Sequence, residues 1–164
     1  MKRSTLQANG CGILLMLAAI TLTTAAMAQE PATGGTKDTS TNIHRDPTGG
    51  YTRRTVEIPP GSRILFISGQ TATDADGNTP ADAETQADII YQKIVQSLED
   101  AGMSVKDLVK TNVYMVNPSD IGALIKAGQK YNPGGSQAGT LVYVKALAYP
   151  DVLIEIEAVA AKKD

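Results

Sequence analysis

The sequence predicts an α+β domain in which two helices back one face of a β-sheet. Two observations support this prediction. Short branched or alternating apolar segments indicate strands, and two other segments repeat apolar residues every three or four positions, as helices do. The order is strand, strand, helix, strand, helix, strand, strand, which favours a mostly antiparallel or mixed sheet. We expect the domain to span residues 51–161, a length that can bury one core.

The first two strands are expected before the first helix. Residues 52–58 (TRRTVEI) partly alternate and are ended by a Pro-Pro-Gly sequence, whereas residues 63–68 (RILFIS) are apolar and branched. Residues 73–78 (TDADGN) have the composition of a turn, with an Asp-Gly pair at its tip.

The first helix is expected from Asp82 to just before Gly102. Its apolar stripe consists of Ala83, Ala87, Ile90, Tyr91, Ile94, Leu98 and Ala101. Gly102 suits the left-handed conformation that often follows a last helical turn. Residues 108–116 (LVKTNVYMV) then alternate as a strand. One face of that strand carries Val109, Thr111, Val113 and Met115.

The second helix is expected to follow a turn and N-cap at residues 117–120 (NPSD) and to end near Tyr131. Gly122 and Gly128 each cost this helix about 1 kcal/mol relative to alanine. The last two strands lie within residues 134–160 (GGSQAGTLVYVKALAYPDVLIEIEAVA). The final strand carries two glutamates, at positions 155 and 157, which the strand repeat places on one face.

Apolar residues are predicted on both faces of the sheet. Besides the inward set, the strands carry Val142, Val144, Leu153 and Val159. A sheet face that is apolar but not covered by helices is typical of a contact between subunits. We therefore expect a homo-oligomer.

The N-terminus has the pattern of a secretory signal. Lys2 and Arg3 precede a short apolar run at residues 13–22 (ILLMLAAITL), and Ala-Met-Ala at residues 26–28 fits a signal-peptidase site. We expect a signal peptide over residues 1–28, a mature chain beginning near residue 29, and a periplasmic or secreted protein. Residues 29–50, rich in Thr, Gly, Pro and Asp, are expected to form a flexible linker.

Removal of the signal limits the chemistry of the mature chain. Cys11, the only cysteine, precedes the apolar run and is lost with it, and His44 is the only histidine. The sequence therefore offers no cluster of metal ligands, and no metal or cofactor is expected. Losing Lys2 and Arg3 from the 15 basic residues leaves 13 against 17 acidic residues, which disfavours a nucleic-acid partner.

Four blocks of the domain occur in one known order. They are residues 67–70 (ISGQ), residues 85–86 (TQ) at the start of the first helix, residues 101–113 (AGMSVKDLVKTNV) and residues 147–160 (LAYPDVLIEIEAVA). These blocks resemble the VSGQ, TQ, AGxSxxDVVKxTVF and C-terminal signatures of the RidA/YjgF family of reactive-intermediate deaminases. The resemblance covers about residues 51–160.

The resemblance implies a chorismate-mutase-like fold and a homotrimer with three small-molecule pockets between adjacent subunits. It also implies hydrolysis of enamines and imines to ammonia and a 2-keto acid. In that chemistry an arginine fork binds the substrate carboxylate, and a carboxylate with a backbone carbonyl positions the attacking water. By resemblance, Glu155 is the catalytic candidate. The ligand-binding candidates are Tyr51, Gly69, Gly139, Thr140 and the backbone of Leu141.

The sequence departs from the family where the arginine is expected. The motif P-A-R-[ST] reads Q-A-G-T at residues 137–140, so that Gly139 replaces the arginine, and Ile125 stands where many deaminases have asparagine. The sequence leaves open whether Arg53, Arg54 or Arg63, from the same or a neighbouring subunit, supplies the cation instead.

Three functions follow from this pattern. The first is an exported deaminase whose cation comes from another part of the chain or from a neighbouring subunit. The second is a hydrolase or deaminase-like enzyme that acts on a substrate other than 2-imino acids. The third is a non-catalytic trimer that binds a ligand or acts as a chaperone. We favour the second, because Gly139 lacks the charge that a 2-imino acid requires. The family is also labelled endoribonuclease, but the acidic balance and the lack of a histidine pair argue against that activity.

Overall fold

The computed structural model describes residues 42–47 and 52–163 of the 164-residue chain. The expected signal peptide of residues 1–28, Cys11 and the site candidate Tyr51 lie outside the described residues. Within the described ranges, no helix is both long and apolar enough to cross a membrane.

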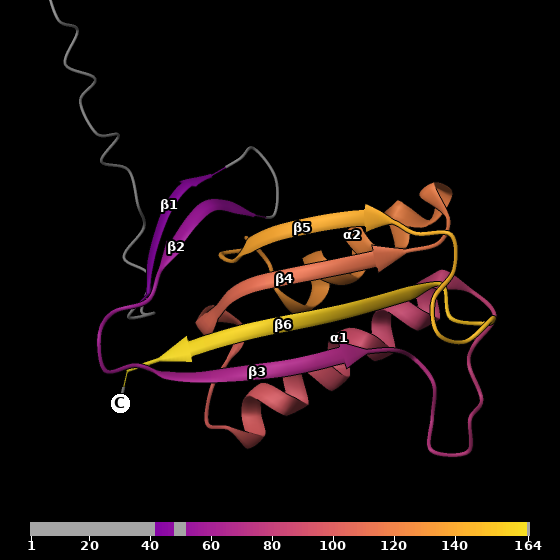
Figure 1. The fold of residues 1–164 in the computed structure, drawn as a ribbon, viewed down its shortest axis with the longest axis horizontal. Helices are drawn as coiled ribbons and strands as arrows, with labels where there is room; N and C mark the ends of the chain where they lie inside the picture. Colours follow the sequence, from indigo (N-terminus) through magenta and orange to yellow (C-terminus); the bar gives the residue numbers. More distant parts are fainter. Residues whose placement is uncertain (1–41, 48–51, 164) are drawn as a thin grey trace, which may run out of the picture. The chain divides into compact units, whose positions relative to one another are not determined.

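Six strands form one mixed sheet in the order β1-β2-β5-β4-β6-β3 (Figure 1). The strands are β1 (Ile43–Pro47), β2 (Arg53–Glu57), β3 (Arg63–Gln70), β4 (Leu108–Met115), β5 (Ala138–Tyr143) and β6 (Ile154–Lys162). β5 pairs in parallel with both β2 and β4, and the remaining neighbours pair antiparallel. The predicted mixed α+β architecture is confirmed.

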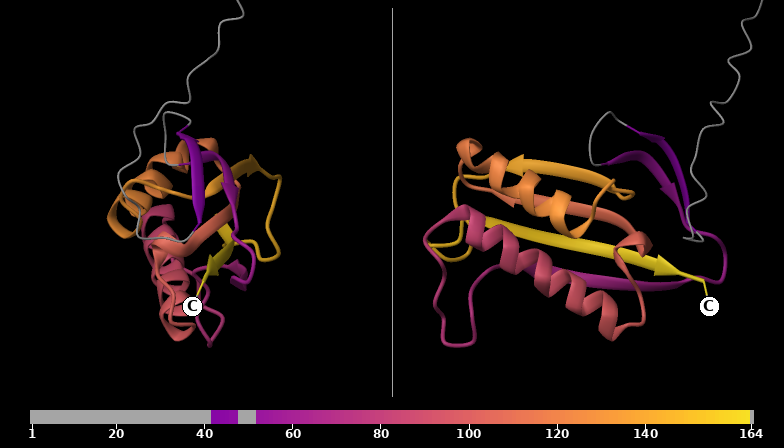
Figure 2. Two further views of the ribbon diagram at one scale, coloured as in Figure 1. Left: turned by 90° about the vertical axis from the view of Figure 1, so that its left-hand side faces the viewer. Right: turned by 180° about the vertical axis from the view of Figure 1, so that it is seen from behind.

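Two helices, α1 (Ala83–Asp100) and α2 (Ile121–Tyr131), cover the same face of the sheet (Figure 2). Asp82 caps α1 by accepting a hydrogen bond from the Thr85 backbone N–H at 2.8 Å, which lowers the pKa of the Asp82 carboxyl. Gly102, with φ of 67°, ends the helix as expected. Short 3₁₀ turns, η1 (Val105–Asp107) and η2 (Pro118–Asp120), precede β4 and α2.

The core lies between α1 and the sheet. Its largest fully buried apolar side chains are Ile90, Ile94, Leu98, Met115, Val152, Ile154 and Ile156. Gln86 is also fully buried; its amide donates to the Pro80 and Asp151 carbonyls at 2.6 and 2.8 Å and accepts from the Leu153 N–H at 2.8 Å. These bonds connect the segment before β6 to α1.

The expectation of a linker over residues 29–50 is wrong for Ile43–Pro47, which form β1. This strand pairs antiparallel with β2, so that Ile43 lies opposite Glu57 and His44 opposite Val56. The His44 ring is hydrogen-bonded to the Ser136 carbonyl rather than solvated. The strand forms because the backbone of β2 satisfies its polar groups, and the polar composition of the segment does not reveal that pairing.

Candidate functional site

A cavity of about 290 Å³ lies between the two helices and strands β4 and β5. It is lined by Thr52, Tyr91, Thr111, Val113, Ile121, Leu124, Ile125, Gly128, Asn132, Gly135, Gln137, Gly139, Thr140 and Leu141. None of these described lining residues carries a charge at neutral pH. The cavity therefore combines an apolar wall with hydroxyl and amide groups, a lining typical of a small-molecule site.

Gly139 lies in this cavity, and the space for a side chain at this position is already filled. A Cβ built on Gly139 would be 2.3 Å from Cγ2 of Thr52 and 3.8 Å from Oγ1 of Thr111. Thr52 comes close because β2 runs parallel beside β5, where Arg53 pairs with Ala138. The methyl group of Thr52 thus takes the place from which an arginine side chain would extend.

Thr140 and Leu141 also line the cavity, as expected for neighbours of Gly139. The Thr140 hydroxyl accepts a hydrogen bond from Nζ of Lys110 at 2.8 Å. In the register of the sheet, Thr140 lies opposite Asn112, whose amide reaches the other sheet face. On β5, Gly139 and Leu141 therefore face the cavity, whereas the Thr140 hydroxyl is directed to Lys110 on the face without helices.

Glu155 and Gly69 form a separate pair outside the cavity. Glu155 follows Ile154 and precedes Ile156, which are 0% and 1% exposed beneath the helices, so its side chain is on the opposite face. A Cβ on Gly69 would be 1.9 Å from Oε1 of Glu155. Within the described residues Glu155 makes no ion pair. One chain therefore does not bring Glu155 to Gly139.

We call the sheet face away from the helices the open face. It holds a hollow of about 330 Å³ lined by Phe66, Ile67, Ser68, Lys110, Asn112, Glu157, Ala158 and Val159. Oε1 of Glu157 accepts hydrogen bonds from Nδ2 of Asn112 at 2.5 Å and from the Tyr114 hydroxyl at 3.2 Å. The bond to Glu157 raises the pKa of the Tyr114 phenol, because it favours the protonated form.

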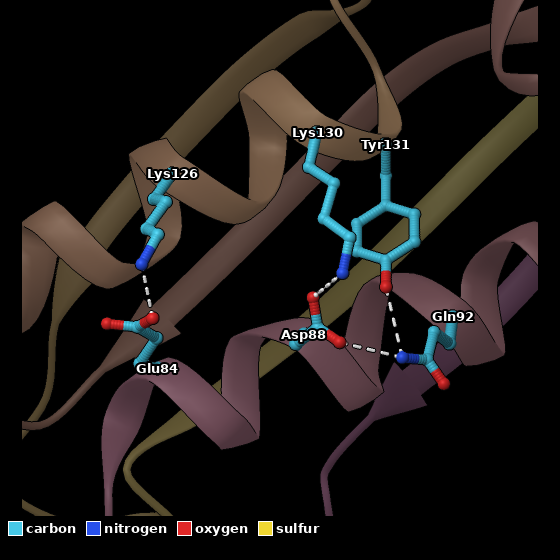
Figure 3. Close-up of polar contacts among 6 residues, drawn as sticks. All are labelled: Glu84, Asp88, Gln92, Lys126, Lys130 and Tyr131. Atoms are coloured by element: carbon cyan, nitrogen blue, oxygen red, sulfur yellow. Dashed lines mark hydrogen bonds and ion pairs between the residues drawn. The ribbon is translucent and has the colours of Figure 1, made fainter.

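Polar contacts hold α2 against α1 beside the cavity (Figure 3). Lys126 forms an ion pair with Glu84, and Lys130 forms one with Asp88 at 2.6 Å. The Lys130 contact lowers the pKa of Asp88 and raises that of Lys130 to about 12. Nε2 of Gln92 donates to Asp88 and to the Tyr131 hydroxyl at 2.7 and 3.0 Å.

The stacked rings of Tyr91 and Tyr131 connect the contact between α1 and α2 to the cavity, because Tyr91 also lines the cavity. The ring of Tyr131 stacks on that of Tyr91, with 5.9 Å between centroids and 5° between planes. The Tyr91 hydroxyl lies beside Gly128, where a Cβ would be 3.2 Å away. The position of Tyr91 in the cavity therefore depends on how α1 and α2 pack.

The three arginines considered as substitutes do not line the cavity. The backbone N–H of Arg53 donates to the Gln137 carbonyl at 2.9 Å. Because Arg53 pairs with Ala138, the Arg53 side chain lies on the same sheet face as Ala138 and not on that of Gly139. The Arg63 guanidinium is directed to the Ala101 carbonyl at 3.4 and 3.5 Å. Within one chain, the cavity is therefore without a cation from any described arginine. No cluster of three or more potential metal ligands occurs among the described residues.

Several lining residues were not predicted as site residues. Tyr91 was assigned to the apolar stripe of α1, and Asn132 and Gln137 carry no motif of their own. Their convergence depends on the packing of α2 and on the chain path between α2 and β5. Among the lining residues, only those of the Q-A-G-T segment belong to a sequence motif that predicts a site.

Comparisons with known proteins agree with the arrangement of these elements. A family model described as Endoribonuclease L-PSP matches residues 42–162. A RutC family protein of Pyrococcus abyssi is 32% identical over 102 residues, covering 61% of this chain and 80% of the relative.

Two solved structures share the fold. One is a protein of unknown function, YyfB of the conserved Rid protein family from Yersinia pestis, with TM-score 0.62 and 30% identity over 73% of this chain and 97% of that one. The other is a member of the YjgF/YER057c/UK114 family from Mycobacterium tuberculosis, with TM-score 0.52 and 26% identity over 66% and 84%.

Proposed function

This chain belongs to the endoribonuclease L-PSP family, which includes the RidA/YjgF proteins, and on that premise we propose that it is a deaminase-like hydrolase of an uncharged small molecule. The observation that carries the proposal is the uncharged lining of the cavity around Gly139. A substrate carboxylate would lose its water shell there without gaining a cation, which is unfavourable. A neutral substrate has no such cost.

The proposed reaction is hydrolysis of an imine. Glu155 accepts a proton from water as the water oxygen bonds to the imine carbon. The carbon–nitrogen bond then breaks, the nitrogen takes up protons and leaves as ammonia, and a carbonyl group remains. The backbone of Leu141 and of Gly69 would help to hold the water and substrate, in the roles that the family resemblance implies.

The proposal includes a homotrimer, because one chain holds Glu155 and the cavity on opposite sheet faces. A second copy would have to bring its carboxylate to the cavity of the first. The open face supports such a contact: Phe66 is 76% exposed, Ile64 51% and Val142 40%. Apolar side chains exposed together on a sheet face favour burial by another copy.

Export is also part of the proposal, with cleavage of residues 1–28 and a periplasmic or secreted location. An exported protein would be separated from the cytoplasmic pyridoxal-phosphate enzymes whose products the RidA/YjgF deaminases hydrolyse. That separation supports a substrate other than a 2-imino acid.

A non-catalytic trimer that binds a ligand or acts as a chaperone is the second candidate. The separation of Glu155 from the cavity within one chain favours it. An ammonia-release assay distinguishes the enzyme from the non-catalytic trimer. It compares two freshly generated analogues, the neutral 2-iminopropanamide and the charged 2-iminopropanoate. The enzyme reading predicts release from the amide and a fall of about 100-fold in Glu155→Gln. A rate no higher than that in buffer on both compounds would favour the non-catalytic reading.

A further inference from the structure

Two buried amide side chains meet at one end of the cavity. Asn132 follows the last residue of α2, and Gln137 precedes the first residue of β5. They are 7% and 6% exposed, and both line the cavity. Nδ2 of Asn132 donates a hydrogen bond to Oε1 of Gln137 at 2.9 Å.

The backbone fixes the orientation of the Gln137 amide. The N–H of Ser136 also reaches Oε1 of Gln137, at 3.1 Å. A backbone N–H can only donate, so the atom that it contacts must be the amide oxygen and not the nitrogen. Nδ2 of Asn132 shares the same oxygen, which fixes the Asn132 amide in turn.

This arrangement leaves the Nε2 amino group of Gln137 and the Oδ1 oxygen of Asn132 for a third partner. Two primary amides can pair through two mutual hydrogen bonds, but this pair makes only one. Among the described residues, neither Nε2 of Gln137 nor Oδ1 of Asn132 forms a hydrogen bond. Neither atom is among the fully buried polar atoms that lack a partner, so both remain accessible and can bond a group in the cavity that their residues line.

We propose that Gln137 and Asn132 recognise a neutral carboxamide, or a similar group with adjacent C=O and N–H, on the cavity ligand. Nε2 of Gln137 would donate to the carbonyl oxygen, and Oδ1 of Asn132 would accept from the N–H. A carboxylate offers acceptors only and would face Oδ1 without a proton between them. The inference rests on the proposed function, in that the cavity is taken to hold the substrate.

The remainder of the cavity fits this ligand class. Val113, Leu124 and Leu141 supply an apolar wall that suits the hydrocarbon part of a small amide. In the P-A-R-[ST] motif that residues 137–140 resemble, position 137 is a proline, which has no side-chain donor. Gln137 is therefore a feature of this chain in the same segment that lacks the arginine.

The proposal is tested by NMR titration, which measures the binding of benzamide and of benzoate to the full chain. The two probes have nearly the same shape and differ in the carboxamide and carboxylate groups. We expect benzamide to bind at least about 10-fold more tightly than benzoate. Gln137→Glu keeps the oxygen that accepts from Ser136 and Asn132 but replaces Nε2. It should weaken benzamide binding about 10-fold, or about 1.4 kcal/mol.

Gln129→Glu is the matched control, because it introduces the same charge at an exposed position of α2. Its benzamide affinity should equal that of the wild type. Gln137→Met removes the donor without adding charge and should also weaken benzamide binding, with a thermal melt to verify that each variant folds.

Three results would overturn the inference: equal binding of benzamide and benzoate, unchanged benzamide binding in both Gln137 variants, or no binding of benzamide to the wild type. Ammonia release from 2-iminopropanamide and 2-iminopropanoate, measured on the same samples, reports separately on the proposed function. An active enzyme without amide preference would retain that function and lose only this inference.

Discussion

The carboxylate of Glu155 occupies the space in which a side chain at Gly69 would lie. A Cβ on Gly69 would be 1.9 Å from Oε1 of Glu155 and 2.8 Å from its Cδ. The two residues lie on β3 and β6, whose register shifts between Ile67 and Gln70. Glycine at position 69 is therefore required for the observed position of the carboxylate.

Gly69→Ala should destabilise the protein by about 1–3 kcal/mol, because the added methyl group displaces the Glu155 side chain. Removal of that side chain relieves the conflict, so Gly69→Ala combined with Glu155→Ala should cost less than the sum of the two single changes. Denaturant unfolding of all four proteins measures this coupling.

Glu157→Ala is the control for that cycle. Glu157 lies on the same face of β6 but contacts Asn112 and Tyr114. We expect its effect to add to that of Gly69→Ala. Strict additivity for Glu155→Ala as well would contradict the steric account.

Phe66→Asp should break the proposed trimer. Phe66 is 76% exposed on the open face, and a buried carboxylate in its place would be strongly unfavourable in a subunit contact. Light scattering after size exclusion should give a trimer for the wild type and a monomer for the variant. Tyr149→Asp, which changes a 63% exposed aromatic residue between β5 and β6, should remain a trimer. A monomeric wild type would remove the basis for a site shared between copies.

The contact between Asp88 and Lys130 should stabilise the packing of α2 over a defined pH range. Its hydrogen bond lowers the pKa of Asp88 from 3.8 and raises that of Lys130 from 10.5 to about 12. The Asp88 contribution is present above its unfolded pKa and is lost as pH falls through the lower, folded pKa. The Lys130 contribution is present below 10.5 and is lost as pH rises through about 12.

Lys130→Met should therefore lower Tm at neutral pH by no more than about 4 °C, since both groups are substantially exposed. The difference from the wild type should shrink in acid, where Asp88 is protonated. Gln129→Met, at a neutral exposed neighbour, should show no such pH dependence. A difference that is constant from acid to neutral pH would rule out the ion pair as its cause.

Local patterns were sufficient to predict most of the fold. The stripe of α1, its start at Asp82 and its Gly102 stop are encoded within neighbouring residues, and the structure confirms all three. β1 could not be predicted in this way, because it depends on pairing with β2. A strand of polar composition is defined by its partner and not by its own side chains.

The candidate site was predictable in part. The resemblance predicts that Gly139 stands where the family motif has an arginine, but the contact with Thr52 arises from the parallel placement of β2 beside β5. The pairing of Asn132 with Gln137 depends on the path of the chain between α2 and β5. Long-range geometry of this kind leaves no periodic signal in the sequence.

Placing an arginine at position 139, as in the motif that the segment resembles, tests the central proposal that Gly139 excludes 2-imino acids. Gly139→Arg alone would conflict with the methyl group of Thr52, so the variant is combined with Thr52→Ala, and Thr52→Ala alone is the control. The measurement is ammonia release from freshly generated 2-iminopropanoate by the wild type and the variants. We predict a rate near that of buffer for the wild type and for Thr52→Ala, and a clear increase for the double variant. Wild-type release well above the buffer rate would contradict the claim.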